Sequence, residues 1–379
     1  MRGSSRLSPE NRPGNHILFS KHLDEMKGCS DMQHLENRTR TTPGDDREAT
    51  AMETTQINPK RSRRSFIHTI AAGAGTLAAG TLMADQGAAL AQAGKPEDLT
   101  IGVSTLGFPD LTNQELAQQL SAHGITLIQL FLNQKDSRYW NYNGRSDVSG
   151  MTAAHAEEIA RTYHSAGIRI HSMGVYTNLI HPDKAEVDAN LQYFDDMMKI
   201  GGDMGVHTFI TEAGHFHDEQ HCKAVPLHFE DEVWPRMVST FKRLAESAGK
   251  NNATILVEPF FQGFFATAKR TRVFLEEVGS PAIRALLDPA NLLELDDLEE
   301  MFQQLAPWID CLHAKDRKLH TQAGVPAGQG DIDYVKFVNL ASQRTPHAPL
   351  VLEYVGPEDY LEALAKLRGA IEECSHRKG

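Results

Sequence analysis

Four side chains that could bind a metal ion follow apolar runs in the second half of the chain. Glu258, Asp288, His313 and Glu353 each come after two or more apolar residues. An acid in this position can simply cap the next helix, and Asp288 taken singly fits that role as well as a chemical one. Three carboxylates that converge on one opening repel one another strongly unless a cation lies between them. Together the four residues predict a cation site.

The elements that must position these residues form a repeating pattern. Short β-like runs are expected at 99–103, 126–132, 168–175, 206–211, 253–258, 283–288, 309–313 and 350–353. Helical patterns follow them at 112–123, 152–166, 184–204, 229–249, 269–278, 296–305, 334–342 and 357–372. Alternating strands and helices imply a parallel sheet buried beneath helices.

Eight such units at this length favour the α/β class and a closed (β/α)8 TIM barrel. In that fold the active site lies at the carboxyl ends of the strands, where the four residues would meet. The main competitor is a doubly wound sheet, which usually has a glycine-rich phosphate turn after its first strand. Residues 103–107 have the sequence VSTLG, which is not such a turn.

The ordered motifs resemble the xylose-isomerase-like TIM-barrel superfamily of sugar isomerases and epimerases over residues 99–372. The resemblance depends on Glu-Pro at 258–259, Asp-Pro-Ala-Asn at 288–291 and His-x-Lys-Asp at 313–316. Gly-Gln-Gly-Asp-Ile-Asp at 328–333 and Leu-Glu-Tyr at 352–354 complete the set. No single motif is specific, but their order is.

The resemblance implies one divalent metal ion bound by Glu258, Asp288, His313 and Glu353. Oxygen-rich ligands with one imidazole favour Mn²⁺, with Mg²⁺, Co²⁺ or Zn²⁺ as alternatives. Glu258 and Glu353 would also be the catalytic acid and base. One removes the proton beside a metal-polarised carbonyl, giving a metal-stabilised enediolate, and the other returns a proton. The order in which the two glutamates act stays open.

Four further residues are candidates for substrate binding. Lys315 could point to the barrel mouth and donate to a substrate oxygen, or be a solvated lysine. Arg317 could contact substrate hydroxyls or form an ion pair with a neighbour, and His215 belongs to a polar cluster with Glu212. Many relatives have a histidine at the position of Asn291, so the amide predicts a different orientation of the substrate. Phenylalanines at 260, 261, 264 and 265 would line the pocket or pack against a second subunit, which leaves a homo-oligomer open.

Composition argues against a nucleic-acid substrate. Residues 1–91 hold 12 of the 38 basic and 10 of the 50 acidic residues, which leaves the remainder with a net charge of −14. Such a surface repels a phosphate backbone. A related endonuclease that acts at abasic DNA sites needs a histidine at position 291 and an Asp-x-His after the seventh strand, and this chain has neither.

The N-terminal part predicts an export signal ahead of the barrel. Residues 1–56 are polar and are expected to be disordered or a mis-assigned extension, with Met52 as an alternative start. Residues 57–93 combine a basic stretch, an apolar region rich in small residues and Ala-x-Ala cleavage sites. Arg63 and Arg64 resemble the twin-arginine signal, which implies the twin-arginine translocation machinery as a partner and a periplasmic location. The barrel would occupy residues 94–379.

Cysteine usage and chemistry complete the expectations. Cys29, Cys222, Cys311 and Cys374 have no paired spacing, so we expect no disulfide framework. The leading hypothesis is an isomerase or epimerase with a sugar substrate. The first alternative is a lyase or hydratase on 3-keto sugars or glycosides, which would use the same proton abstraction but expel a β-substituent. The second alternative is a non-catalytic sugar-binding barrel.

Overall fold

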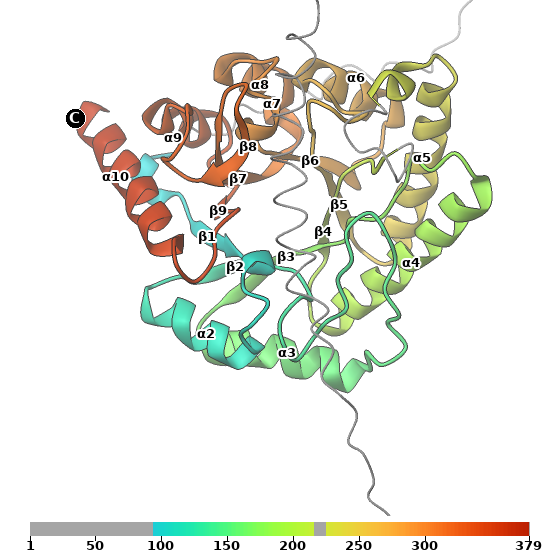
Figure 1. Cartoon of the computed structure of the whole chain (residues 1–379), viewed down its shortest axis with the longest axis horizontal. Helices are drawn as coiled ribbons and strands as arrows, with labels where there is room; N and C mark the ends of the chain where they lie inside the picture. Colours follow the sequence, from blue (N-terminus) through green and yellow to red (C-terminus); the bar gives the residue numbers. More distant parts are fainter. Residues whose placement is uncertain (1–93, 216–224, 379) are drawn as a thin grey trace, which may run out of the picture. The chain divides into compact units, whose positions relative to one another are not determined.

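The structure, a computed structural model, describes residues 94–215 and 225–378 (Figure 1). The proposed extension at 1–56 and the proposed signal at 57–93 lie outside the described residues and stay predictions. Among the described residues, no helix is both long enough and apolar enough to cross a membrane.

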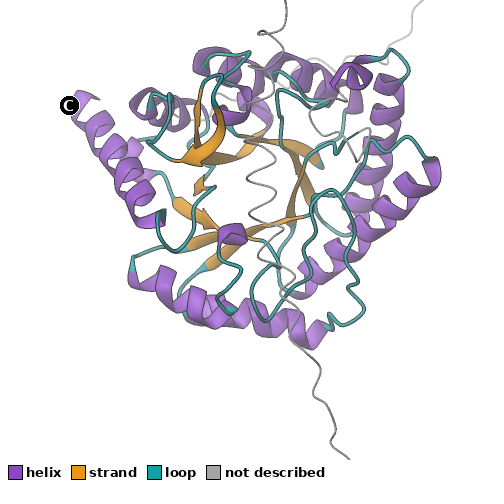
Figure 2. Ribbon diagram, in the orientation of Figure 1, coloured by secondary structure: helices purple, strands orange, loops and turns teal. Residues whose placement is uncertain are grey.

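Eight parallel strands close into a barrel. They are β1 (Ile101–Ser104), β2 (Leu127–Leu130), β3 (Arg169–Gly174), β4 (Thr208–Thr211), β5 (Thr254–Val257), β6 (Ile283–Leu287), β7 (Ile309–Lys318) and β9 (Leu350–Leu352). Each pairs in parallel with its neighbours, and β9 pairs with both β1 and β7, which closes the ring. Figure 2 shows this ring of strands surrounded by helices. The predicted (β/α)8 barrel is confirmed.

The helices that cover the barrel begin where the sequence provides caps. They are α2 (Asn113–Ala122), α3 (Ala153–Ser165), α4 (Lys184–Asp203), α5 (Val233–Lys250), α6 (Ala268–Val278), α7 (Pro289–Leu292), α8 (Leu298–Leu305), α9 (Tyr334–Arg344) and α10 (Tyr360–Lys378). Threonine or aspartate side chains accept the first free backbone N–H groups of seven of them, at Thr112, Thr152, Asp183, Thr267, Asp288, Asp297 and Asp333. Such caps typically stabilise a helix by about 1 kcal/mol each.

Two elements were not expected from the sequence, and a third begins later than expected. The segment after β7 was expected to be a loop, but it returns as β8 (Gln322–Pro326), which pairs antiparallel with the outer end of β7. A single helical turn, α7, follows β6 directly. The start of α5 is also later than expected, because Val225–Phe229 forms a separate 3-10 helix.

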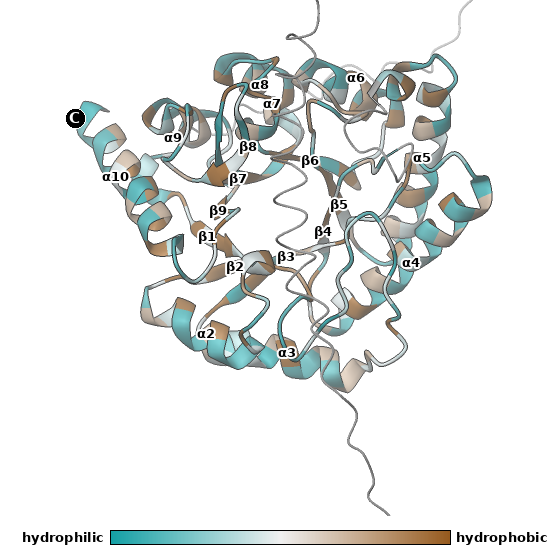
Figure 3. Ribbon diagram, viewed as in Figure 1, coloured by the Kyte–Doolittle hydropathy of each residue, from teal (hydrophilic) through white to brown (hydrophobic). Residues whose placement is uncertain are grey.

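The barrel encloses its own apolar layer. Its inner layer consists of buried side chains from successive strands, namely Leu127, Ile210, Leu256, Leu286, Cys311 and Val351. A separate and larger core lies between the strands and the covering helices. Figure 3 colours the residues of these helices by hydropathy. Cys311 and Cys374 are both buried free thiols, and Cys29 and Cys222 lie outside the described residues.

Candidate metal centre

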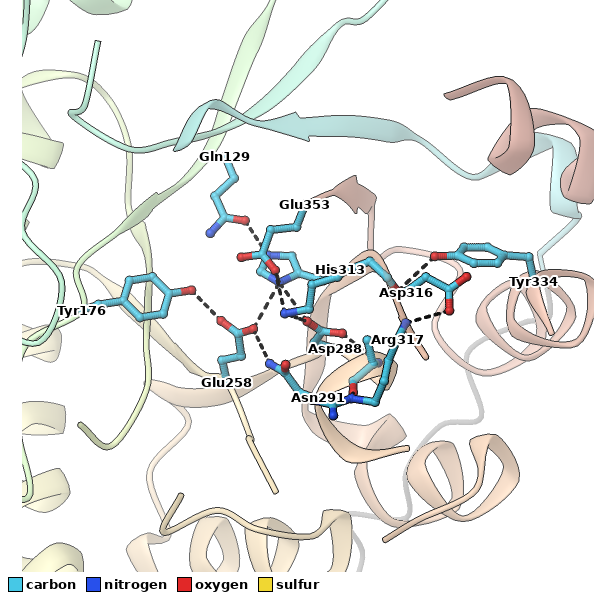
Figure 4. A network of polar contacts seen from close by, with 12 residues as sticks. Gln129, Tyr176, Glu258, Asp288, Asn291, His313, Asp316, Arg317, Tyr334 and Glu353 are labelled. Carbon is cyan, nitrogen blue, oxygen red and sulfur yellow. Dashed lines mark hydrogen bonds and ion pairs between the residues drawn. The ribbon is translucent and has the colours of Figure 1, made fainter. Parts of the chain in front are cut away.

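Strand geometry places the site directly above the inner layer. Alternate residues of a strand face the same side, so the residue two positions after each inner-layer residue also points into the barrel. For β5, β6, β7 and β9 those residues are Glu258, Asp288, His313 and Glu353. Each of the four offers a ligand atom within 4.8 Å of the other three, and all four side chains are buried. The structure brings the predicted ligand set together (Figure 4).

The Nδ1 atom of His313 is the meeting point of the three carboxylates. It lies 3.3 Å from Oε1 of Glu258, 3.4 Å from Oε2 of Glu353 and 3.9 Å from Oδ2 of Asp288. Burial opposes protonation of His313, but the charges of Glu353 and Glu258 outweigh it and raise the pKa of the imidazole to about 10. A concentration of negative charge of this kind is what a divalent cation would neutralise.

Asp288 caps a helix and also faces the other predicted ligands. Its Oδ1 accepts a hydrogen bond of 2.9 Å from the backbone N–H of Ala290 and so caps α7. Its Oδ2 faces the other ligands and lies 2.7 Å from Nζ of Lys315. The cap fixes the carboxylate, which leaves one oxygen directed at the cluster.

Lys315 also lies within the cluster. It is two residues beyond His313 on β7, so strand alternation directs both side chains to the same side. Its Nζ contacts Oε2 of Glu353 at 3.1 Å as well as Asp288, and it lies 4.5 Å from the ring centre of Tyr354. Burial alone would lower the pKa of this ammonium group, but the charges of Asp288 and Glu353 raise it well above its usual value.

Glu258 is held by two hydrogen-bond donors. The Tyr176 hydroxyl donates to Oε2 at 2.5 Å, and the Asn291 amide donates to Oε1 at 2.9 Å. Figure 4 shows these two side chains on either side of the carboxylate. Asn291, which the sequence suggested as a substrate ligand, therefore contacts a predicted metal ligand in the described structure.

The donor set fits a divalent metal ion. Three carboxylates and one neutral imidazole nitrogen suit an oxygen-preferring cation such as Mn²⁺ or Mg²⁺, and Zn²⁺ accepts the same atom types. A cation there would compete with the proton on Nδ1 of His313.

Two other predicted residues lie beside this centre. The guanidinium of Arg317 donates to the carbonyl of Ala290 and to Glu294, and it stacks 4.7 Å from the ring centre of Phe261. These contacts anchor the turn that carries Asn291. His215 contacts the Tyr142 hydroxyl at 3.0 Å through Nε2, and Tyr142 donates to Glu212 at 2.9 Å.

The alternation of side chains along a strand also explains why Glu212 points into the barrel. It follows Ile210 of the inner layer by two residues on β4, as Glu258 follows Leu256 on β5. Both glutamates line one small cavity, together with His215 and Phe260. Burial and the charge of Glu258 raise the pKa of Glu212 to about 8.

Sequence reasoning missed Gln129 and Tyr176. Gln129 follows Leu127 of the inner layer by two residues, so the same alternation rule could have found it. Tyr176 lies beyond the end of β3 and stacks on Phe131, with 5.7 Å between ring centres. Its contact with Glu258 depends on the path of the chain after the strand, for which the sequence offers no periodic signal.

Aromatic rings form one wall of the barrel mouth. Trp140 packs edge-on against Phe131 at 5.6 Å, and Tyr142 lies 6.3 Å from both Trp140 and Tyr176. Of the phenylalanines after Glu258, Phe264 and Phe265 pack in the core against Phe274. An aromatic face beside a polar cluster is a surface that can accommodate a sugar ring.

Fold and site together define an eight-stranded barrel with a metal-competent cluster at the carboxyl ends of its strands. The model of the xylose isomerase-like TIM barrel family matches residues 116–370, which is more than half of the chain. The chain therefore belongs to this family. A search of curated proteins finds no match.

Solved structures share the fold at low sequence identity. A D-tagatose 3-epimerase-like protein is 12% identical with a TM-score of 0.62, covering 74% of this chain and 100% of its own. A probable 3-DHS dehydratase from Bacillus anthracis is 17% identical with a TM-score of 0.58, covering 71% and 98%. The 3-keto-D-glucoside 4-epimerase from E. coli is 14% identical with a TM-score of 0.58, covering 72% and 99%.

Proposed function

We propose that this protein is a divalent-metal-dependent sugar isomerase or epimerase that acts by proton abstraction next to a carbonyl. The observation that carries the proposal is the cluster of Glu258, Asp288, His313 and Glu353, whose ligand atoms lie within 4.8 Å of one another. A sugar-binding protein without catalysis has no need for two such buried glutamates beside a metal site.

The roles of the residues follow from their contacts. A divalent ion, when bound by the four ligands, would supply Lewis acidity to a substrate carbonyl and its neighbouring hydroxyl. One of Glu258 and Glu353 removes the proton from the substrate carbon that carries this hydroxyl group, next to the carbonyl. The other glutamate returns a proton to that carbon or to its neighbour. The Lys315 ammonium, next to Glu353 and Asp288, donates to a substrate oxygen as negative charge develops.

A second candidate is a lyase that uses the same proton abstraction on 3-keto sugars or glycosides. It is favoured by a protein of the same fold that is named a probable dehydratase. The 3-keto-D-glucoside 4-epimerase of the same fold is itself an epimerase, so its name bears on the substrate class alone. In the lyase reaction the electron pair of the broken C–H bond expels a β-substituent, whose oxygen takes up a proton as it leaves, so no second protonation at carbon is needed.

Metal analysis is the first test of the proposal. The purified protein should hold about one divalent ion per chain, and Glu258→Gln or Asp288→Ala should reduce this content. Asp296→Asn is the matched control, because Asp296 is also buried but caps Ala268 with its carboxylate at 2.7 Å. Less than half an ion per chain in the wild type, unchanged in both site variants, would remove the basis for the mechanism.

Reaction in D₂O then separates the candidate chemistries. Ketoses and 3-keto glycosides are incubated with the protein, and products are analysed for solvent deuterium and released aglycone. Deuterium at carbon in a recovered isomer or epimer supports the isomerase. Release of the aglycone supports the lyase. Binding of a sugar with neither product would instead indicate the non-catalytic barrel.

The export signal remains part of the proposal. We infer that Arg63 and Arg64 direct the protein to the twin-arginine machinery and so to the periplasm. Replacement of both by lysine in the full chain should leave the protein in the cytoplasm, as measured by cell fractionation with a cytoplasmic marker. Unchanged export of that variant would contradict the inference.

A further inference from the structure

One buried side chain contacts the candidate metal centre from outside the ligand set. Gln129 is 0% exposed and projects from β2 into the same layer as the four ligands. Its Oε1 lies 2.6 Å from Nε2 of His313, on the side of the ring away from the carboxylates (Figure 4). The histidine therefore has Gln129 on one nitrogen and the metal-competent cluster on the other.

The chemistry of an amide oxygen decides which nitrogen of His313 is available. An amide oxygen only accepts hydrogen bonds, so Nε2 of His313 must carry a hydrogen to donate to it. A neutral imidazole has one N–H, and its second nitrogen is then an acceptor with a free lone pair. Gln129 thus fixes the tautomer in which Nδ1 faces Glu258, Asp288 and Glu353.

The other end of Gln129 indicates that this contact is not incidental. Among the residues that the structure describes, Nε2 of Gln129 has no hydrogen-bond partner. A buried amide N–H without a partner destabilises the fold, because the group has lost its hydrogen bonds to water. An apolar side chain of the same size would avoid that cost in the barrel interior, but it would leave His313 without an acceptor.

We propose that Gln129 is the positioning residue of the metal centre and holds His313 in the tautomer and orientation that bind a divalent ion. The inference depends on the metal-binding part of the proposed function and is independent of the substrate. Groups that accept from the outer nitrogen of a metal-binding histidine typically change metal affinity by about 10–100-fold.

Two substitutions of Gln129 should differ in their effect on metal affinity. Gln129→Met has nearly the same length but no acceptor, and we expect it to weaken divalent-metal binding about 10–100-fold. Gln129→Glu keeps an acceptor and makes it stronger, so its metal affinity should equal or exceed that of the wild type. Affinities are measured for Mn²⁺ and Zn²⁺ by calorimetry on the full chain.

Gln134→Met is the matched control. Gln134 is likewise 0% exposed and has one atom without a partner among the described residues, but its amide donates to the carbonyl of Thr105 at 2.8 Å. Its described hydrogen bond goes to Thr105 and not to His313, so its loss should lower stability without a change in metal affinity. Thermal unfolding of all variants gives the stability comparison.

A spectroscopic measurement separates positioning from general damage. In protein labelled with ¹⁵N-histidine, His313 with metal bound should show a hydrogen on Nε2 only, and Gln129→Met should lose the slow solvent exchange of that hydrogen. Metal binding by the wild type together with an affinity of Gln129→Met within threefold of it would overturn the inference. An equal loss in Gln134→Met would overturn it too. Absence of metal binding by the wild type would instead refute the proposed function.

Discussion

At the scale of single residues, His313 links protonation to metal binding. Its Nδ1 faces three carboxylates, and their negative charges raise the pKa of the imidazole to about 10. A metal ion can bind Nδ1 only after that proton leaves. The two cations therefore compete for one atom.

Metal affinity should accordingly rise with pH. Between pH 6 and 9 each bound divalent ion should displace close to one proton, because His313 is protonated across this range without metal. Calorimetry in two buffers that differ in ionisation enthalpy measures the released protons directly. An affinity that is constant over this range, with no proton release, would contradict the described environment of His313.

Tyr176 offers a second test at this scale. Tyr176→Phe removes the donor that lies 2.5 Å from Oε2 of Glu258 and leaves the carboxylate with Asn291 and with Nδ1 of His313, which is 3.3 Å from Oε1. A hydrogen bond to a charged group contributes about 1.5–3 kcal/mol. We expect kcat for deuterium exchange into substrate to fall about 10–100-fold with little change in KM.

The control for this substitution is Tyr163→Phe. Tyr163 is also fully buried, and its hydroxyl donates to Asn113 at 2.9 Å, between α2 and α3. That change should lower stability and leave kcat unaltered. Equal activity of Tyr176→Phe and the wild type would show that the Glu258 contact has no part in the reaction.

The ligand set could be predicted from the sequence because each ligand ends an apolar run. The contacts of the residues around these ligands could not be predicted from the sequence. Substrate binding by Asn291 stays a prediction, but the sequence did not indicate that its amide, in the turn of α7, donates to Glu258. Arg317 similarly bonds to Ala290 and Glu294. Such directions depend on loop geometry, which has no period in the sequence.

At the scale of elements, the hairpin of β7 and β8 explains the Gly-Gln-Gly-Asp motif. The buried carboxylate of Asp316 accepts backbone N–H groups from Arg317, Gly328 and Ile332 at 2.8–3.1 Å. A side chain at Gly330 would come within 2.4 Å of that carboxylate. The motif therefore folds tightly over Asp316 and fixes the outer end of the strand that carries His313 and Lys315.

Asp316→Ala should destabilise the barrel by roughly 3 kcal/mol, because three backbone donors lose a charged acceptor in a buried position. Urea unfolding measures the change. Asp331→Ala is the comparison within the same hairpin, since Asp331 is exposed and accepts one backbone N–H, from Leu319 at 2.7 Å. It should cost less than about 1 kcal/mol, and similar losses for both would contradict the role of Asp316.

The missed elements have a common physical reason. The strand β8 is short, ends in proline and is stabilised by pairing with β7 at Lys315 and Asp316. The turn α7 is four residues long and depends on the cap from Asp288. Both are stabilised by contacts with neighbours, whereas the barrel strands and covering helices have periodic apolar patterns that a sequence displays directly.

At the scale of the whole molecule, the two ends of the barrel differ in chemistry. The amino-terminal end of the strands holds a charged group in which Arg284 donates to Asp310 and His347 lies 3.3 Å from it. His171 of β3 is near these charges, and burial lowers its pKa to about 4. This end stabilises the fold, and the carboxyl ends of the strands carry the candidate site.

His171 predicts a pH dependence of stability. Its pKa is about 4 when folded and 6.5 when exposed, so below pH 6.5 the unfolded chain binds more protons. The folded state should lose about 2 kcal/mol from this group as pH falls from 6.5 to 4, after allowance for partial exposure. His171→Gln should reduce the fall in the free energy of unfolding between pH 6.5 and pH 4. His164→Gln, at an exposed position, should not. The same pH dependence of the free energy of unfolding in the wild type and in His171→Gln would refute the prediction.

The placement of each ligand two residues above a packed inner-layer side chain has a consequence for how this protein can change. Inserting one residue before Glu258 within β5 would turn the carboxylate toward the covering helices, so the ligands tolerate no change in strand length. The loops that follow the strands carry Trp140, Tyr142 and His215, and they can lengthen or vary while the ligands stay in place. For the proposed function, this separates the strand residues that would carry the chemistry from the loop residues that would select the substrate, and we expect variants with new substrates to differ in the loops and keep the strands.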